Sequence, residues 1–214
     1  MSFKKNKYQV IKEAIPKDMA NFIFNYMMLQ QDAVYYMTQN NIINPANPVI
    51  GNWVDKQVPG AYSKYADWVM ETLLLYVRPI MEKKTGLSLV PTYSYTRIYN
   101  KGNILKKHKD RPSCEISTTL HLGGDLWPIF IDPTGADTVI DEHKQIHKPN
   151  APKGKKVLLH QGDMLIYSGC ELEHWREKFT GNICCQVFLH YNHAEGKFAN
   201  TNLFDKRKLL GIPK

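Results

Sequence analysis

The sequence predicts a mainly β fold of the α+β class, in which N-terminal helices buttress a jelly roll or sandwich. Apolar residues recur every three or four positions between residues 17 and 84, which is the spacing of amphipathic helices. After Leu87 the spacing changes to two, and seven or eight short strand-like runs follow. Turn pairs such as Gly123-Gly124 and Gly162-Asp163 separate these runs, as in antiparallel sandwiches and jelly rolls.

The length of 214 residues suits one sizeable core and is short of two full domains. We therefore expect a single domain over residues 1–214. Within it, residues 1–90 would form the helical buttress, residues 91–192 the jelly-roll core, and residues 193–214 an irregular tail.

The first part of the chain is expected to contain an extended arm and a helix. The run YQVIKEAI at residues 8–15 predicts a short strand or extended segment. Pro16 suits the first turn of a helix, and the apolar stripe that follows predicts this helix over about 17–39. Asn40–Pro59, with two Asn-Pro pairs, is expected to be a loop.

A second helix is expected over about 61–84, because apolar residues keep the same spacing there. Pro79 should kink or break it. Lys83 and Lys84 suit its last turn, and Gly86 suits its end.

The remaining elements are expected to be strands. In the first, Tyr93 to Tyr99 alternates between two faces, and a turn at 101–103 follows. Residues 133–155 look loop-rich, with at most one short strand. Further strand-like runs lie at 115–122, 127–132, 157–167 and 183–191.

The bulk composition points to an ordinary globular protein of the cytoplasm. No run of 18 apolar residues and no secretory signal are apparent. The four cysteines show no C-x-x-C spacing, so we expect them to be reduced. The net charge of +8 is compatible with a lysine-rich solvated surface, which we favour, or with attraction to nucleic acid or another acidic partner.

Two histidines and one carboxylate form a candidate metal site. His108 and Asp110 are two residues apart, so the end of a strand would direct both to one face. His174 lies 66 residues further along and would come from a distant strand. Two histidines and a carboxylate on one face of a metal leave the opposite positions open, which is the facial triad of non-heme Fe(II) oxygenases.

Five sequence features carry a family resemblance. They are YQVIKEAI before a helix, RIYNKG before HKD, EISTTLHL after it, GDMLIYSGCELEH, and a closing G-x-x-x-x-QVFLHY at Gly181–Tyr191. Over about residues 8–192 the chain resembles the 2-oxoglutarate/Fe(II)-dependent dioxygenases of the prolyl-4-hydroxylase-like branch. It is also similar to oxygenases of this type from phage and marine microbes.

The resemblance implies a double-stranded β-helix in which His108, Asp110 and His174 hold Fe(II). It implies that 2-oxoglutarate chelates the iron and that O2 is the oxidant, with succinate and CO2 as products. It further implies hydroxylation of a C–H bond, most readily of a prolyl, peptide or amino-acid substrate.

The sequence departs from this branch at the residue that usually pairs with the 5-carboxylate of 2-oxoglutarate. A basic residue normally lies nine or ten positions after the distal histidine, but Ile183 and Cys184 lie there. We expect Arg176 to replace it, because on a strand Arg176 points the same way as His174 and a guanidinium binds a carboxylate through two hydrogen bonds. The alternative for Arg176 is a surface ion pair with a neighbouring glutamate, Glu173 or Glu177.

Three further residues are expected to assist in binding 2-oxoglutarate. They are Tyr99, His121 and Gln186. Arg97 and Lys178 are held in reserve for the same role.

Competing functions remain open. One is an oxidative demethylase or hydroxylase of nucleic acid, which the basic charge allows but no base-recognition motif supports. Another is a cupin-like jelly roll that binds metal or ligand without turnover, which the missing basic residue favours. A third is a basic nucleic-acid-binding module with no metal, whose binding would depend strongly on salt.

Overall fold

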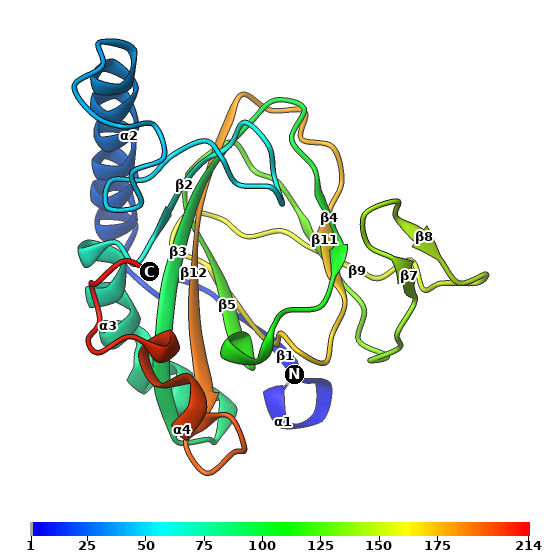
Figure 1. The fold of residues 1–214 in the computed structure, drawn as a ribbon. Coiled ribbons are helices and arrows are strands. Elements are labelled where there is room, and N and C mark those ends of the chain that lie inside the picture. The colour runs from blue at the N-terminus through cyan, green and yellow to red at the C-terminus, as the bar shows by residue number, and fades with distance from the viewer. Residues whose placement is uncertain (1) are drawn as a thin grey trace.

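The computed structural model describes residues 2–214 and places two antiparallel sheets face to face, with helices on one side (Figure 1). The six-stranded sheet has the order β1-β10-β5-β12-β3-β2, and the four-stranded sheet has the order β4-β11-β6-β9. A small hairpin, β7-β8, projects beside the four-stranded sheet.

The strands are β1 Tyr8–Ile11, β2 Tyr62–Tyr65, β3 Leu89–Asn100, β4 Leu105–His108, β5 Ile116–Gly124, β6 Ile129–Ile131, β7 Val139–Asp141, β8 Ile146–His147, β9 Lys155–Val157, β10 Met164–Ser168, β11 His174–Arg176 and β12 Ile183–His193. The helices are α1 Phe3–Asn6, α2 Lys17–Gln39, α3 Trp68–Thr85 and α4 Ala199–Asn202, with 3-10 turns at Pro112–Cys114 and Leu203–Lys206.

The core has two layers, one on each face of the six-stranded sheet. Helices α2 and α3 cover its outer face, where Met27, Leu74 and Val187 belong to one cluster of buried apolar residues. On the inner face, smaller apolar clusters fill the space between the two sheets. Apolar burial of this kind is the main favourable term in folding, and it makes the inner layer a dry setting for polar side chains.

The expected helix at 17–39 is confirmed, and so are the strands around residues 93–99 and 183–191. The helix expected over 61–84 begins later than predicted, because Tyr62–Tyr65 forms β2 and pairs with β3. Ala66 then takes a left-handed conformation (φ 55°), and the side chain of Asp67 accepts hydrogen bonds from the backbone N–H groups of Val69 (2.9 Å) and Met70 (3.3 Å). This cap starts α3 at Trp68.

The predicted break at Pro79 does not occur, because α3 continues through it to Thr85. The carbonyl that loses its partner belongs to Leu75, a residue on the exposed side of the helix, where water can bond it. The helix ends as expected, with Gly86 in the left-handed conformation (φ 73°).

Two other segments are more regular than expected. Residues 133–155 were expected to hold at most one short strand, but β7 and β8 pair with each other there. The tail contains α4 and is fixed by the buried carboxylate of Asp205, which binds Arg111 at 2.7 Å and the Tyr65 hydroxyl at 2.7 Å. Arg207 in the same tail forms a buried ion pair with Glu71 of α3 at 2.6 Å.

The four cysteines are free thiols, as expected. Among the helices of residues 2–214, none is long and apolar enough to cross a membrane.

Candidate metal centre

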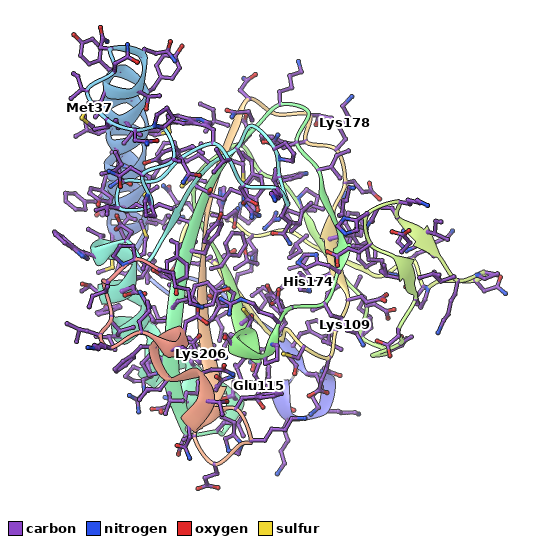
Figure 2. All side chains as sticks on the ribbon, in the orientation of Figure 1. Met37, Lys109, Glu115, His174, Lys178 and Lys206 are labelled. Atoms are coloured by element: carbon purple, nitrogen blue, oxygen red, sulfur yellow. The ribbon has the colours of Figure 1, made fainter. Side chains whose placement is uncertain are left out.

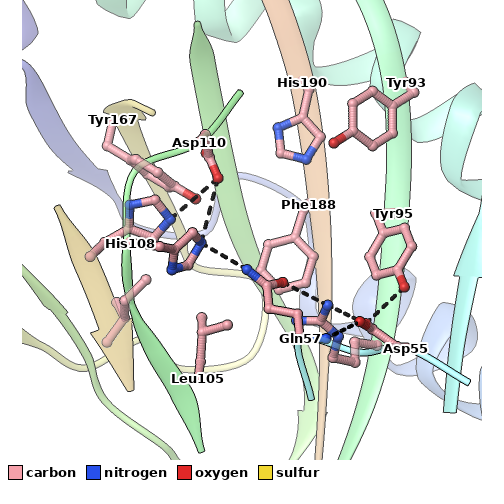
Figure 3. A pocket seen from close by; sticks show the side chains of 13 residues that line it. Asp55, Gln57, Tyr93, Tyr95, Leu105, His108, Asp110, Tyr167, Phe188 and His190 are labelled. Carbon is pink, nitrogen blue, oxygen red and sulfur yellow. Dashed lines mark hydrogen bonds and ion pairs between the residues drawn. The ribbon is translucent and has the colours of Figure 1, made fainter. Parts of the chain in front are cut away.

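The three predicted metal ligands meet between the two sheets. His108 ends β4 and His174 begins β11, and the two residues lie opposite each other in the antiparallel pair. Asp110 follows β4, where its backbone N–H donates to the carbonyl of Gly169 at 2.9 Å. One carboxylate oxygen, Asp110 Oδ1, lies 3.7 Å from His108 Nε2 and 3.5 Å from His174 Nε2 (Figure 3).

Backbone carbonyls fix the orientation of both imidazoles. His108 Nδ1 lies 2.7 Å from the carbonyl oxygen of Lys106, and His174 Nδ1 lies 3.0 Å from that of Leu172. A carbonyl can only accept, so each Nδ1 carries a proton, and Nε2 is the nitrogen left to bind a metal ion. This is the arrangement that a metal-binding histidine requires.

The carboxylate of Asp110 is oriented in the same way. Its Oδ2 accepts a hydrogen bond from Ser117 Oγ at 3.0 Å, which leaves Oδ1 toward the two histidines. Burial alone would raise the pKa of Asp110, but the imidazoles of His174 and His108 hold it well below its usual range. The site therefore offers an ionised carboxylate and two imidazole nitrogens.

These three donor atoms fit a single metal ion. Ligands about 2.1 Å from one metal, at angles of 90–120°, lie roughly 3.0–3.6 Å from one another. The observed distances of 3.5 and 3.7 Å are close to this range. A second cluster in residues 2–214, Asp110, Cys114 and His190, also has metal-ligand spacing. It fits less well, because burial raises the pKa of the Cys114 thiol well above its usual value, and that thiol contacts the Tyr93 hydroxyl at 3.0 Å.

Gly169 allows the chain to pass close to the candidate ligand Asp110. A Cβ at this position would lie 2.4 Å from Asp110 Oδ2 and 2.3 Å from the carbonyl oxygen of Cys114. Both distances are far below van der Waals contact, so only glycine fits at residue 169.

A buried ion pair links the two histidine-bearing strands. Lys107, next to His108, lies 3.0 Å from the carboxylate of Glu173, next to His174, and both side chains are less than a tenth exposed. Glu173 also accepts hydrogen bonds from the backbone N–H groups of Thr138 (2.5 Å) and Val139 (2.9 Å). Burial alone would raise the pKa of Glu173, but a hydrogen bond from the Thr138 hydroxyl, together with these backbone bonds and Lys107, lowers it to about 2.

A cavity of about 200 Å³ opens from the candidate metal ligands into the space between the sheets (Figure 3). Its walls are aromatic, with Tyr93, Tyr95, Phe188 and His190 among them. At its other end lies Arg97, which was held only in reserve as a 2-oxoglutarate ligand. Arg176, Tyr99, His121 and Gln186 are not among the residues that line this cavity.

Arg176 lies in the protein interior, 1% exposed, and the described residues offer it no carboxylate within ion-pair distance. The surface ion pair considered for it is therefore not formed, and Glu173 pairs with Lys107 instead. Arg176 donates to the carbonyl of Trp127 and, at 3.2 Å, to the hydroxyl of Thr119, while its Nε has no partner within residues 2–214.

The other predicted 2-oxoglutarate ligands lie near Arg176. Thr119 Oγ1, which accepts from Arg176, donates to Gln186 Oε1 at 3.0 Å. Gln186 Nε2 lies 2.7 Å from His121 Nδ1. Burial and the charge of Arg176 lower the pKa of His121 to about 4, so this imidazole is neutral at pH 7. Arg176, His121 and Gln186 therefore belong to one hydrogen-bonded chain that passes through Thr119.

Tyr99 is fully buried on the same sheet face, and its hydroxyl accepts from Arg97 Nη1 at 3.1 Å. Cys184 fills the position of the usual basic residue and is also buried. Lys178, the other reserve, is exposed. Figure 2 shows it at the edge of the molecule and His174 between the sheets.

Sequence reasoning missed several residues of the site. Ser117 and Thr119 share the inward face of β5 with His121, so strict alternation along the strand could have identified them. Asp55 and Gln57, which reach the cavity from the loop at 40–61, left no signal, because loop residues carry no periodicity.

Comparisons with known proteins identify the fold. No protein-family model matches the sequence, and no curated protein matches it. Among solved structures, the non-heme alpha-ketoglutarate-dependent carbocyclase SnoK from nogalamycin biosynthesis is similar with a TM-score of 0.62 and 13% identity, over 99% of this chain and 92% of that one. A Pseudomonas putida prolyl-4-hydroxylase is similar with a TM-score of 0.52 and 13% identity, over 89% and 95% of the two chains.

HygX from Streptomyces hygroscopicus, solved with nickel, 2-oxoglutarate and hygromycin B, gives a TM-score of 0.55 and 13% identity, over 90% of this chain and 85% of that one. At identities this low the likeness shows the fold alone. The predicted architecture is thereby confirmed: the chain has the double-stranded β-helix fold of the 2-oxoglutarate/Fe(II) oxygenases.

Proposed function

We propose that this chain is a non-heme Fe(II) oxygenase that couples decarboxylation of 2-oxoglutarate to hydroxylation of a C–H bond. The observation that carries the proposal is the convergence of His108 Nε2, His174 Nε2 and Asp110 Oδ1 on one side of a cavity in this fold. Three ligands on one face leave positions for a chelating cosubstrate and O2, whereas a closed four-ligand site would not.

When bound, Fe(II) with 2-oxoglutarate and O2 supplies the oxidant that removes hydrogen from the substrate. The chain supplies the geometry of the site. Ser117 holds the carboxylate of Asp110, and the carbonyls of Lys106 and Leu172 hold the two imidazoles. The aromatic walls of the cavity keep bulk water away from the reacting atoms.

Arg176 is the proposed partner of the 2-oxoglutarate 5-carboxylate. A buried guanidinium with no carboxylate beside it is costly, and an anionic ligand removes that cost. Its neighbour Thr119 donates its one hydroxyl hydrogen to Gln186 and would turn it to the same group, while Gln186 and His121 hold the chain of hydrogen bonds behind Thr119 in place. Tyr99 completes the proposed set of 2-oxoglutarate ligands. It lies on β3, which pairs with β12, the strand of Gln186.

The substrate is proposed to be a prolyl or other peptide residue, or an amino acid. Solved neighbours include a viral collagen prolyl hydroxylase, with a TM-score of 0.55 and 8% identity, and HygX with hygromycin B, so this fold serves both polymers and small molecules. Hydroxylation or demethylation of nucleic acid is the second candidate, which only the net charge of +8 favours. The single domain over residues 1–214 and the cytoplasmic location stay predictions.

The test is an anaerobic titration of metal-free protein with Fe(II) and then 2-oxoglutarate, followed by the visible charge-transfer absorption of the chelate. We expect a band for the unchanged protein and for the control His143→Ala, whose side chain lies in the exposed β7–β8 hairpin. We expect none for His174→Ala. Iron binding without a band would leave a cupin-like binding protein as the better description, and no iron binding would refute the metal site.

A further inference from the structure

The cavity beside the metal ligands contains a second buried guanidinium, Arg97, for which the proposed chemistry has no use. Arg97 belongs to β3, the long central strand, and is 4% exposed. The rings of Tyr95, Tyr99 and Phe188 surround it, with centroids 5.1, 5.5 and 5.8 Å from its guanidinium carbon. A cation held this firmly on a strand is a fixed feature of the cavity wall.

The negative partner of Arg97 comes from a loop. Arg97 Nη2 binds the carboxylate of Asp55 and, at 2.9 Å, the amide oxygen of Gln57. Asp55 also accepts a hydrogen bond from the Tyr95 hydroxyl at 2.9 Å. No other carboxylate in the described part of the chain pairs with Arg97. Residues 55–57 thus form a strap across the cavity (Figure 3).

The strap has to lose one of its contacts when a metal ion binds. At its other end, Gln57 Nε2 lies 3.0 Å from His108 Nε2, the nitrogen that the proposed metal site uses. One imidazole lone pair cannot serve both an amide N–H and a metal ion, so metal binding releases Gln57. The strap is then held by its bonds to Arg97 and by the bond from Tyr95 to Asp55. The peptide around Asp55 belongs to the irregular loop between α2 and β2.

The charges decide what can replace Asp55. The charge of Arg97 contributes to lowering the pKa of Arg176, mainly a result of its burial, so the two cations sense each other in the interior. If 2-oxoglutarate neutralises Arg176, a ligand that moves Asp55 aside must bring a negative group of its own, because a buried unpaired guanidinium is costly. A planar carboxylate matches the guanidinium with two parallel hydrogen bonds.

We propose that Arg97 binds the terminal carboxylate of the substrate and that Asp55 occupies this position in the free protein. The inference rests on the proposed function and narrows it: the substrate is a small acid, a free amino acid or a peptide C-terminus, and not an internal residue of a long peptide. The carboxylate end would lie against Arg97, and the aromatic residues Tyr93, Tyr95 and Phe188 would pack along the rest of the molecule toward the metal ligands.

The first experiment measures binding to metal-free protein, by calorimetry and by the shift of Tm. The probes are the free amino acids and their glycyl dipeptides, each compared with its own C-terminal amide. Asp55→Asn removes the internal carboxylate and keeps its shape, so we expect about 10- to 100-fold tighter binding of at least one acid than in the unchanged protein. The affinity for the matching amide should not change. Comparing the free amino acids with the dipeptides shows whether the carboxylate belongs to a free amino acid or to a peptide C-terminus.

Two variants serve as controls. Asp55→Asn combined with Arg97→Gln keeps a neutral hydrogen-bonding pair and should lose the acid binding, even if Arg97→Gln alone fails to fold. Lys56→Gln changes a charge on the exposed neighbouring residue and should behave as the unchanged protein. In the unchanged protein, a bound acid should also speed hydrogen exchange at the Gln57 N–H, which donates to Asp55 at 2.8 Å.

Three results would overturn the inference. They are equal affinity for acids and amides, unaltered acid binding in the double variant, and a double variant that loses 2-oxoglutarate affinity instead, which would make Arg97 the cosubstrate's partner. Failure of the iron chelate band would refute the proposed function separately, because the binding assay needs neither iron nor 2-oxoglutarate.

Discussion

Replacing Glu173 with glutamine should lower the free energy of unfolding by more than the same change at an exposed carboxylate nearby. The carboxylate of Glu173 is 2% exposed, pairs with Lys107 at 3.0 Å and accepts hydrogen bonds from Thr138 and Val139. The substitution removes the charge and leaves the Lys107 ammonium, 8% exposed, without a counter-charge. Breaking a buried pair in this way costs about 3–5 kcal/mol.

For a chain of this size that loss corresponds to a fall in Tm on the order of 10 °C. The matched control is Asp137→Asn, which makes the same chemical change in another ion pair. Asp137 pairs with Lys109, and its side chain is 81% exposed. Exposed pairs contribute about 0–1 kcal/mol, so the control should shift the urea midpoint little. Both variants are measured by urea unfolding at pH 7.

The pH dependence supplies a second reading of the same variant. The pKa of Glu173 is lowered from 4.5 to about 2, so this carboxylate contributes stability above pH 4.5 and loses it as pH falls toward 2. Glu173→Gln should therefore flatten the acid side of the stability curve. If Glu173→Gln costs no more than Asp137→Asn and the acid slope is unchanged, the pair does not stabilise the two histidine-bearing strands and the reasoning fails.

Three further predictions concern the site itself. Arg176→Met should weaken 2-oxoglutarate binding about 100-fold with little change in Fe(II) affinity, because a charged hydrogen-bonding partner is lost. Titration of the chelate band measures both affinities. Unchanged 2-oxoglutarate affinity would contradict the assignment and point to Arg97 instead. Ser117→Ala should weaken Fe(II) binding about tenfold, because Asp110 loses the bond that orients it; an anaerobic Fe(II) titration tests this, with equal affinity as the contrary result. Burial, with a further contribution from the charge of Arg176, lowers the pKa of His121 from 6.5 to about 4. Between these pH values the unfolded chain binds a proton that the folded chain does not. The free energy of unfolding should therefore fall as pH drops from 6.5 to 4, by up to about 3 kcal/mol. His121→Asn should reduce this slope in urea unfolding at pH 4.5 and 7, and a slope equal to that of the unchanged protein would show that His121 does not titrate this way.

Local patterns in the sequence predicted the bounds of α2 but not which of its faces is buried. The apolar stripe from Met19 to Tyr36 matches the length of the helix, but its large members Phe22 and Leu29 are each 71% exposed, and the face that carries Met27 is buried instead. The same rule failed at Tyr62, whose apolar spacing looked helical. A long-range pairing with Ile98 of β3 and the cap at Asp67 decide its conformation, and neither is visible in a local window.

The proximity of the three candidate metal ligands could be predicted because their spacing reflects strand geometry, with His108 and Asp110 at the end of one strand and His174 opposite His108. Which cation faces which carboxylate could not be predicted, because it depends on how β11 and β3 face each other across the sandwich. The sequence favoured Arg176 as the partner of 2-oxoglutarate and held Arg97 in reserve, but it could not predict that the loop residue Asp55 pairs with Arg97.

The narrow passage at Gly169 gives a practical way to recognise distant relatives of this chain. Any side chain there would collide with Asp110 Oδ2, so packing against the proposed metal ligand requires glycine at this position. A pattern that joins His-x-Asp to a glycine five residues before the distal histidine demands only what the packing at this centre requires, and it can be applied to chains whose overall similarity has faded.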